Sequence, residues 1–281
     1  MKLVRFGAKG AEKPGIVDAN GAIRDLSGVT ADFVDAGVSV DAINKIRGVD
    51  VSSLPMAPAG SRLGPVVGRV NNFIAIGLNY ADHAAESNLP IPKEPIIFNK
   101  APSTLAGPND DVVIPPGSEK SDWEVELAIV IGKDCYQVSE ADALNYVAGY
   151  AVCNDISERA WQTEGTGQWT KGKSAPGFGP LGPWLVTPDE IPNVQSLSMF
   201  LDVNGKRIQT GNTATMIFGA AFIVSYVSKF MLMQPGDVIT TGTPPGVGMG
   251  FKPPIYLKVS DTMHLGIEGL GEQHQTCIAY K

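Results

Sequence analysis

Three things are scarce in this 281-residue sequence: basic residues, paired cysteines and long apolar runs. The 22 Lys and Arg residues are outnumbered by 29 Asp and Glu residues, so the formal charge is −7 at pH 7. Binding of nucleic acid would require a basic stripe that displaces counterions, so we expect no such partner. The three cysteines form no CxxC motif, and we recognise no signal peptide. These features predict reduced thiols in a cytoplasmic protein.

The longest apolar segment, MIFGAAFIVSYV at residues 216–227, is too short to span a bilayer. We therefore expect no membrane partner. The segment predicts a buried helix instead, with Thr213 or Thr215 as its N-cap.

Strand-like segments dominate the rest of the chain. Residues 1–65 contain short strands and one helical pattern, DFVDAGVSVDAINKI, and a Pro/Gly-rich segment at residues 53–69, SLPMAPAGSRLGPVVGR, follows this helical pattern. We place a boundary near residue 68, between a small N-terminal α/β domain (1–68) and a catalytic domain (69–281). Beyond this boundary strand patterns greatly outnumber helical ones, which predicts a strand-rich α+β fold and not a doubly wound α/β sheet.

Two glutamates interrupt one of these strand patterns, SDWEVELAIVIG at residues 121–132. Because side chains alternate along a strand, Glu124 and Glu126 share a face with Ala128 and Val130. Two neighbouring carboxylates at the mouth of a core repel each other, so a positive group is expected between them. A hard divalent cation suits such a pair. The alternative is an edge strand with solvated glutamates.

A third acid, Asp155, ends another apolar run, VAGYAVCND. A carboxylate at the end of a core strand can converge with Glu124 and Glu126. Asp155 could instead cap a helix that begins within ISERAWQTE, and the sequence is compatible with both roles.

Residues 79–86, NYADHAAE, contain a histidine and a glutamate three positions apart. On a helical turn His83 and Glu86 lie on one side, where the carboxylate can orient the imidazole and raise its basicity. The other ring nitrogen could then take a proton from water. The alternative is a structural or merely exposed histidine.

The segment GQWTKGKS at residues 167–174 matches the P-loop pattern letter for letter. That pattern binds phosphates only between a buried strand and a helix. Here a polar segment precedes it, and Pro176 and Pro180 follow, so we expect no nucleotide. The loop presents Lys173 to an anionic substrate, unless Lys173 is an ordinary surface lysine. Thr241 and Thr243, in the small-residue loop GDVITTGTPPGVGMG, could receive a carboxylate.

Taken in order, IGLNYADHAAE, PIIFNKAPST, DWEVELAIVIG, YVAGYAVCNDISERAWQ, GKSAPGFGPLGPWLVT and GDVITTGTPPGVG resemble the fumarylacetoacetate hydrolase family. The resemblance implies a mixed β-sandwich roll and a homodimer. It implies Mg²⁺ or Mn²⁺ ligands at Glu124, Glu126 and Asp155, a water-activating dyad of His83 and Glu86, the active-site lysine Lys173, carbonyl-binding groups at Arg159 and Gln162, and substrate-carboxylate contacts at Thr243 and Lys100.

The larger members of this family carry a further aspartate ligand upstream of the histidine, which NFIAIGLNY does not offer. The resemblance therefore implies the branch that acts on short 2-oxo or 2,4-dioxo acids. Residues 163–187 and the NTATMIF segment look most like hydrolases of 2,4-diketo-3-deoxy-L-rhamnonate or L-fuconate. Such enzymes yield pyruvate and a hydroxy acid such as lactate. Oxaloacetate-type decarboxylation, 2-hydroxy-diene-dioate isomerisation and 2-oxo acid binding without turnover are the alternatives.

Overall fold

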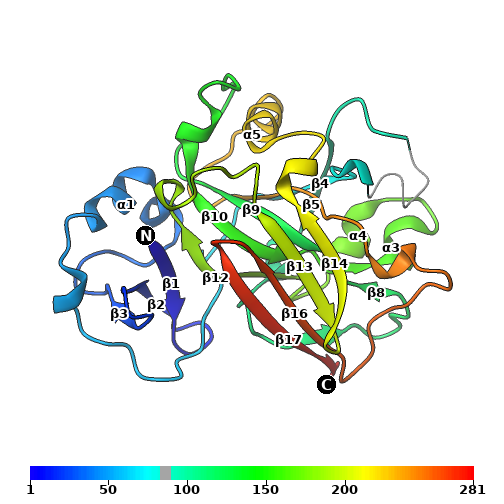
Figure 1. Ribbon diagram of the computed structural model, residues 1–281, viewed down its shortest axis with the longest axis horizontal. Coiled ribbons are helices and arrows are strands. Elements are labelled where there is room, and N and C mark those ends of the chain that lie inside the picture. Colours follow the sequence, from blue (N-terminus) through cyan, green and yellow to red (C-terminus); the bar gives the residue numbers. More distant parts are fainter. Residues whose placement is uncertain (83–89) are drawn as a thin grey trace.

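A computed structural model describes residues 1–82 and 90–281 (Figure 1). Most of its strands form a large sheet with the strand order β3–β2–β1–β12–β10–β9–β15–β4–β5, and β6 pairs with β12 beside this path. The bounds in that order are β3 (Ile23–Asp25), β2 (Lys13–Val17), β1 (Lys2–Phe6), β12 (Gly179–Val186), β10 (Val147–Asn154), β9 (Val125–Ile131), β15 (Val238–Thr240), β4 (Phe73–Gly77), β5 (Ile96–Lys100) and β6 (Leu105–Ala106).

A second sheet has the order β14–β13–β16–β17–β7, and β8 and β11 form a separate ribbon. The bounds are β14 (Lys206–Asn212), β13 (Ser198–Val203), β16 (Thr262–Ile267), β17 (Gly271–Ala279), β7 (Val112–Ile114), β8 (Ser121–Asp122) and β11 (Ser157–Glu158). Parallel and antiparallel pairs occur in both sheets. The strand-rich α+β prediction is confirmed.

The described helices are short. They are α1 (Val40–Ile46), α3 (Arg159–Thr163), α4 (Trp169–Lys173) and α5 (Ala220–Ser228), with 3₁₀ helices η1 (Asp35–Val38), η2 (Val51–Ser53), η3 (Pro102–Thr104), η4 (Ala143–Tyr146), η5 (Pro188–Glu190), η6 (Thr213–Thr215) and η7 (Gly248–Gly250). The predicted N-cap of α5 is wrong. Thr213–Thr215 forms the separate turn η6, and Gly219 is the N-cap. None of the helices in the described ranges has the length and apolar character needed to cross a bilayer.

Two apolar cores lie on the opposite faces of the large sheet, and β9 contributes to both. Its odd-numbered residues, from Val125 to Ile131, join a core that includes inward side chains of β13 and β16 and of α5. Ala128 and Val130 join the other core, which is shared with the N-terminal residues. The face predicted for Glu124 and Glu126 is therefore the face of this second core.

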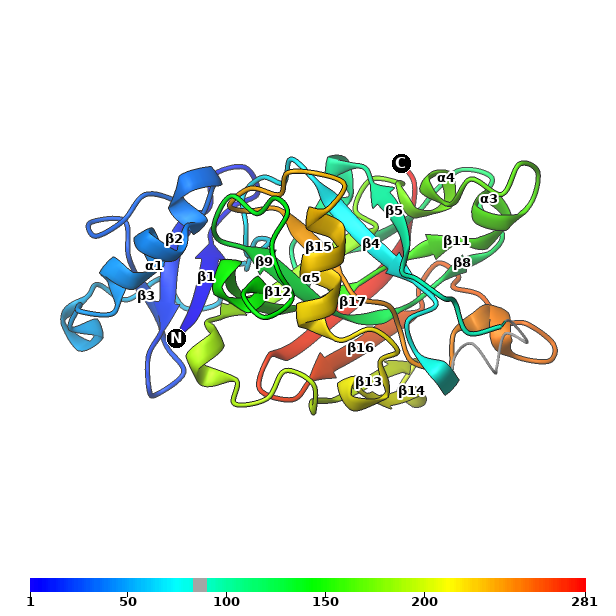
Figure 2. The same cartoon turned by 90° about the horizontal axis from the view of Figure 1, so that it is seen from above.

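The N-terminal strands extend the large sheet, because Leu3 of β1 pairs in register with Leu185 of β12. Figures 1 and 2 show residues 1–65 at the end of the molecule opposite α3 and α4. Both the sheet and the second core continue across the predicted boundary near residue 68. The division into domains 1–68 and 69–281 stays a prediction.

Candidate active site

Three buried carboxylates converge where β9 and β10 begin to separate. Glu126 is directly opposite Cys153 in the antiparallel register, and the backbone N–H of Asp155 donates to the carbonyl of Glu124 at 2.9 Å. Asp155 therefore continues the row of side chains that faces Glu124 and Glu126. Carboxylate oxygens of Glu124, Glu126 and Asp155 all lie within 4.8 Å of one another.

Two lysines form ion pairs with these carboxylates. The ammonium of Lys173, at the end of α4, lies 2.6 Å from Glu124 Oε2 and 2.7 Å from Asp155 Oδ2. Lys100, at the end of β5, donates to Asp155 Oδ1 and, at 2.7 Å, to the carbonyl of Lys173. Both lysine side chains are buried, so Lys173 is not an ordinary surface lysine.

Arg159, the first residue of α3, links the carboxylates to the neighbouring loops. Its Nη2 lies 2.7 Å from Glu124 Oε1, its Nε donates to Asp122 Oδ2 at 2.7 Å, and its Nη1 donates to Gln162 Oε1 at 2.9 Å. The N-cap of α3 is Glu158, whose side chain accepts from the N–H of Ala160. The capping role considered for Asp155 therefore belongs to Glu158.

Glu126 is the least compensated of the three carboxylates. Burial raises the pKa of Glu126 well above its ordinary value, and the charges of Asp155 and Glu124 raise it further. Its Oε2 accepts from the backbone N–H of Gly242 at 2.8 Å. A divalent cation would neutralise this excess of buried negative charge, and three carboxylates are hard oxygen ligands. The donor set therefore fits Mg²⁺ or Mn²⁺.

Lys173 and Arg159 stay charged despite their burial. Burial alone would lower the pKa of Lys173, but the carboxylates of Asp155 and Glu124 outweigh it and raise the pKa. Burial opposes the charge of Arg159 as well, and Asp122 and Glu124 raise its pKa above the ordinary value. Both side chains therefore present fixed positive charge at neutral pH.

The P-loop-like segment forms a helix that ends at its lysine, Lys173, and no helix follows directly. Residues 169–173 form α4, and residues 174–178 lead into β12. A Cβ at Gly172 would lie 2.4 Å from the carbonyl of Glu158 and 2.5 Å from the N–H of Gln162. Glycine at this position therefore lets α4 pack closely against the start of α3, and the motif has a packing reason that involves no phosphate.

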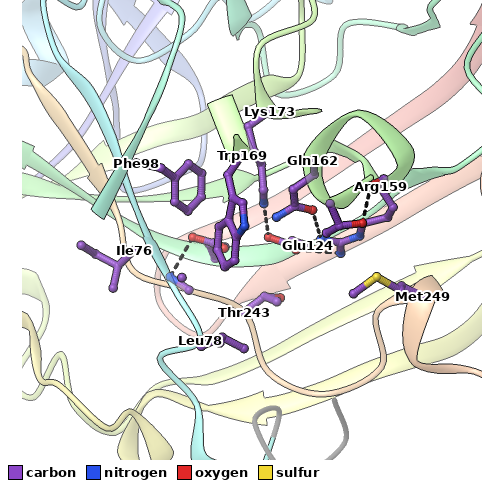
Figure 3. Close-up of a pocket in the computed structure, with 14 residues that line it drawn as sticks. Ile76, Leu78, Phe98, Glu124, Arg159, Gln162, Trp169, Lys173, Thr243 and Met249 are labelled. Atoms are coloured by element: carbon purple, nitrogen blue, oxygen red, sulfur yellow. Dashed lines mark hydrogen bonds and ion pairs between the residues drawn. The ribbon is translucent and has the colours of Figure 1, made fainter. Parts of the chain in front are cut away.

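A cavity of about 100 Å³ opens beside the carboxylates. Figure 3 shows Phe98, Trp169 and Lys173 across from Leu78, Thr243 and Met249. The Trp169 ring packs edge to face on Phe98, with ring centroids 5.3 Å apart. A Cβ at Gly77 would lie 2.3 Å from the Trp169 ring, so this approach requires glycine there. The cavity thus has charged side chains at one end and largely apolar side chains along the rest of its lining.

Asp122 is a functional candidate that we did not predict from the sequence. Its fully buried carboxylate accepts from Arg159 Nε, from the N–H of Trp123 at 2.8 Å, and from the N–H groups of Gly248 and Met249 at 2.7 and 3.0 Å. One side chain therefore positions both Arg159 and the 248–249 loop. The sequence does contain a signal for this role, because Asp122, Glu124 and Glu126 are acidic residues spaced two positions apart.

Asp122→Asn should lower kcat/KM by roughly 10- to 100-fold, because an amide cannot accept hydrogen bonds on both sides as the carboxylate does. Arg159 would lose an ionic partner while the affinity for a divalent cation changes little. Steady-state kinetics together with calorimetric metal titration would measure both effects. Asp111→Asn, the same change at an exposed position, is the matched control. A kcat/KM within twofold of the wild-type value would contradict the positioning role.

The remaining predicted residues fall into three groups. Arg159, Gln162 and Thr243 line the cavity. The hydroxyl of Thr243 donates to the Val125 carbonyl at 2.9 Å. To donate to a substrate carboxylate, this hydroxyl would have to rotate and give up that hydrogen bond. Lys100 does not appear among the described lining residues and holds Asp155 instead. His83 and Glu86 lie outside the described residues.

A second group of metal-ligand side chains lies on the outer sheet, on the strands β16 and β17. His264 and His274 are cross-strand partners with stacked rings, and Glu272 Oε2 lies 2.8 Å from His264 Nε2. Neither histidine lines the cavity described above. The side chains of this group are exposed or half-buried, whereas the three carboxylates at the cavity are buried.

The sequence matches a known family over the strands that build this site. The family described as fumarylacetoacetate (FAA) hydrolase C-terminal matches residues 72–278. This chain belongs to the fumarylacetoacetate hydrolase family. A Burkholderia multivorans protein described only as a hydrolase is 58% identical over 276 residues, with 98% of each chain covered.

Two solved structures in this family bear on the chemistry. A maleylpyruvate hydrolase from Sphingobium sp. SYK-6, in complex with manganese(II) and pyruvate, has a TM-score of 0.82 at 29% identity and covers both chains fully. A 2-hydroxyhepta-2,4-diene-1,7-dioate isomerase from Mycobacterium marinum has a TM-score of 0.76 at 31% identity, covering 99% of this chain and 98% of that chain. The scaffold of this chain thus serves hydrolases and isomerases of small acids.

Proposed function

We propose that this chain is a divalent-metal-dependent hydrolase that cleaves a carbon–carbon bond of a 2,4-dioxo acid. The observation that carries this proposal is the convergence of three buried carboxylates beside Lys173 and an open cavity. The reaction adds water to an acylpyruvate and releases pyruvate and a carboxylic acid. At the finest level we propose 2,4-diketo-3-deoxy-L-rhamnonate or L-fuconate as the substrate, with lactate as the second product.

Glu124, Glu126 and Asp155 would hold Mg²⁺ or Mn²⁺. When bound, this ion would supply the Lewis acidity that makes the pyruvyl fragment a good leaving group. The manganese and pyruvate present together in the maleylpyruvate hydrolase support this assignment.

The side chains divide the remaining chemistry. We propose that His83, oriented by Glu86, takes a proton from the attacking water. Gln162 Oε1 already accepts from Arg159, which leaves the amide NH₂ of Gln162 to donate to the C4 carbonyl. Lys173 and Arg159 supply fixed positive charge close to the oxygen that becomes negative as water adds. Neither Lys173 nor Arg159 has to move far, because buried acids already hold both side chains.

A substrate panel tests this function and separates it from its rivals. We would assay 2,4-dioxo acids, oxaloacetate and 2-hydroxy-diene-dioates with Mg²⁺ and with Mn²⁺, and identify the products by NMR. Hydrolysis predicts equal amounts of pyruvate and a short acid from 2,4-dioxo acids. Carbon dioxide from oxaloacetate as the dominant product, or isomerisation without cleavage, would favour the alternatives on the same scaffold.

In the same assay His83→Ala should lower kcat for 2,4-dioxo acids by about 100-fold, the smaller end of the range for loss of a general base. Binding of Mn²⁺ and of the substrate should stay within a few-fold of the wild-type values. His264→Ala, which replaces a histidine that is not among the described lining residues of the cavity, is the matched control. Hydrolysis by His83→Ala at the wild-type rate would refute the water-activating role.

A further inference from the structure

The charges at the site come close to balance before any substrate arrives. Within the described part of the chain, four buried carboxylates, those of Asp122, Glu124, Glu126 and Asp155, cluster with three buried cations, Lys100, Arg159 and Lys173. With every group ionised, one negative charge is in excess. A bound divalent cation changes this to one positive charge in excess, which a single substrate carboxylate would neutralise.

Among its described lining residues, the cavity offers no further cation to a second carboxylate. Of the described residues that line it, only Arg159 and Lys173 are cationic, and both already pair with acids. Among the described lining residues, a second anionic group would therefore find no further partner of opposite charge.

The wall beyond the carboxylates is largely apolar. Ile76, Leu78, Phe98, Trp169 and Met249 form most of it (Figure 3). The polar side chains of the wall, such as Gln162 and Thr243, are neutral. An ionised group against such a surface loses hydration that no ion pair replaces.

We infer that the site selects substrates with one carboxylate and an uncharged tail, and discriminates against dicarboxylic 2-oxo and 2,4-dioxo acids. This inference rests on the proposed function, because it places the substrate carboxylate and 2-oxo group at the metal end of the cavity. The uncharged tail then lies along Leu78, Trp169 and Met249. Maleylpyruvate and 2-hydroxyhepta-2,4-diene-1,7-dioate, which name the two solved relatives, each carry two carboxylates. The inferred specificity therefore separates this chain from both.

Two matched pairs of compounds test the inference. 2-Oxopentanoate and 2-oxopentanedioate differ only in the replacement of a terminal methyl group by a carboxylate, and neither contains the bond to be cleaved. Calorimetry on the Mn²⁺-loaded protein should show the monocarboxylate binding at least about 100-fold more tightly. For turnover, 2,4-dioxoheptanoate and 2,4-dioxoheptanedioate differ in the same way, and kcat/KM should favour the former by a similar factor.

A charge added to the wall should reverse part of this selectivity. Met249, at the rim of the cavity and 36% exposed, is the position of choice. Met249→Lys should raise the relative affinity for 2-oxopentanedioate about tenfold or more, whereas the neutral control Met249→Gln should not. The ratio between the two compounds is the quantity measured, so a general loss of affinity does not affect the comparison.

The outcomes separate this inference from the proposed function. Equal or tighter binding of the dicarboxylates by the wild-type protein would overturn the inference, even if 2,4-dioxo acids were hydrolysed. Preference for 2-oxopentanoate without hydrolysis of any 2,4-dioxo acid would support the inference and refute the hydrolase function. If Met249→Lys left the affinity ratio between 2-oxopentanoate and 2-oxopentanedioate unchanged, the substrate tail would not lie beside Met249, and the assignment of the tail to this apolar wall would be wrong.

Discussion

Glu126→Gln should bind Mg²⁺ or Mn²⁺ at least about 100-fold more weakly than the wild type and lose roughly a thousandfold in kcat/KM. Glu126 is fully buried, and besides the Gly242 N–H its surroundings are dominated by the negative charges of Asp155 and Glu124. An amide of the same shape keeps the hydrogen bond from Gly242 but removes the charge that a cation needs. Metal titration by calorimetry and steady-state kinetics at saturating Mn²⁺ would measure both losses.

The same substitution should not unfold the protein. Because the Glu126 carboxylate is desolvated among like charges, a neutral side chain should leave the metal-free free energy of unfolding unchanged or raise it. Chemical denaturation of the metal-free variant distinguishes this outcome from a folding defect. Glu119→Gln makes the same change at an exposed position of the preceding loop and is the matched control. Wild-type metal affinity in Glu126→Gln would exclude Glu126 as a ligand.

The sequence predicts the row of acids well because it depends on local periodicity. Alternation along β9 assigns Glu124 and Glu126 to one face, and the two cores confirm that the remaining residues of the strand alternate. The approach of Asp155 follows from the antiparallel pairing of β9 and β10. The pairing register itself was not predictable from either strand alone, so convergence remained one of two possibilities for Asp155.

The groups that surround the acids depend on contacts between distant segments, and the sequence predicts them poorly. Asp122 belongs to the ribbon β8–β11, and its importance arises from Arg159 and the 248–249 loop, which are distant along the chain. The burial of Lys173 depends on α4 packing against α3 through Gly172. The role of Lys100 in holding Asp155 also required the tertiary structure.

The second large effect concerns Lys173, whose ammonium bridges two of the carboxylates. Lys173→Met should lower kcat by about a thousandfold, because it removes fixed positive charge beside the reacting carbonyl. Unlike the Glu126 variant, it should not weaken the binding of Mn²⁺. The ammonium lies 2.6 Å from Glu124 Oε2 and 2.7 Å from Asp155 Oδ2, so it competes with a metal ion for these oxygens.

Stability measurements complete the contrast between the two variants. Without Lys173, Glu124 and Asp155 lose a shared buried cation, so the metal-free Lys173→Met protein should unfold at a lower temperature than the wild type. Added Mn²⁺ should then raise the melting temperature of the variant by more than it raises that of the wild type, because the ion replaces the missing positive charge. Lys171→Met, at an exposed position of the same helix, should change neither kcat nor melting temperature. If Lys173→Met kept kcat within threefold of the wild type, or lost Mn²⁺ affinity as Glu126→Gln is expected to, Lys173 would be a structural partner of the metal ligands and would have no direct part in catalysis.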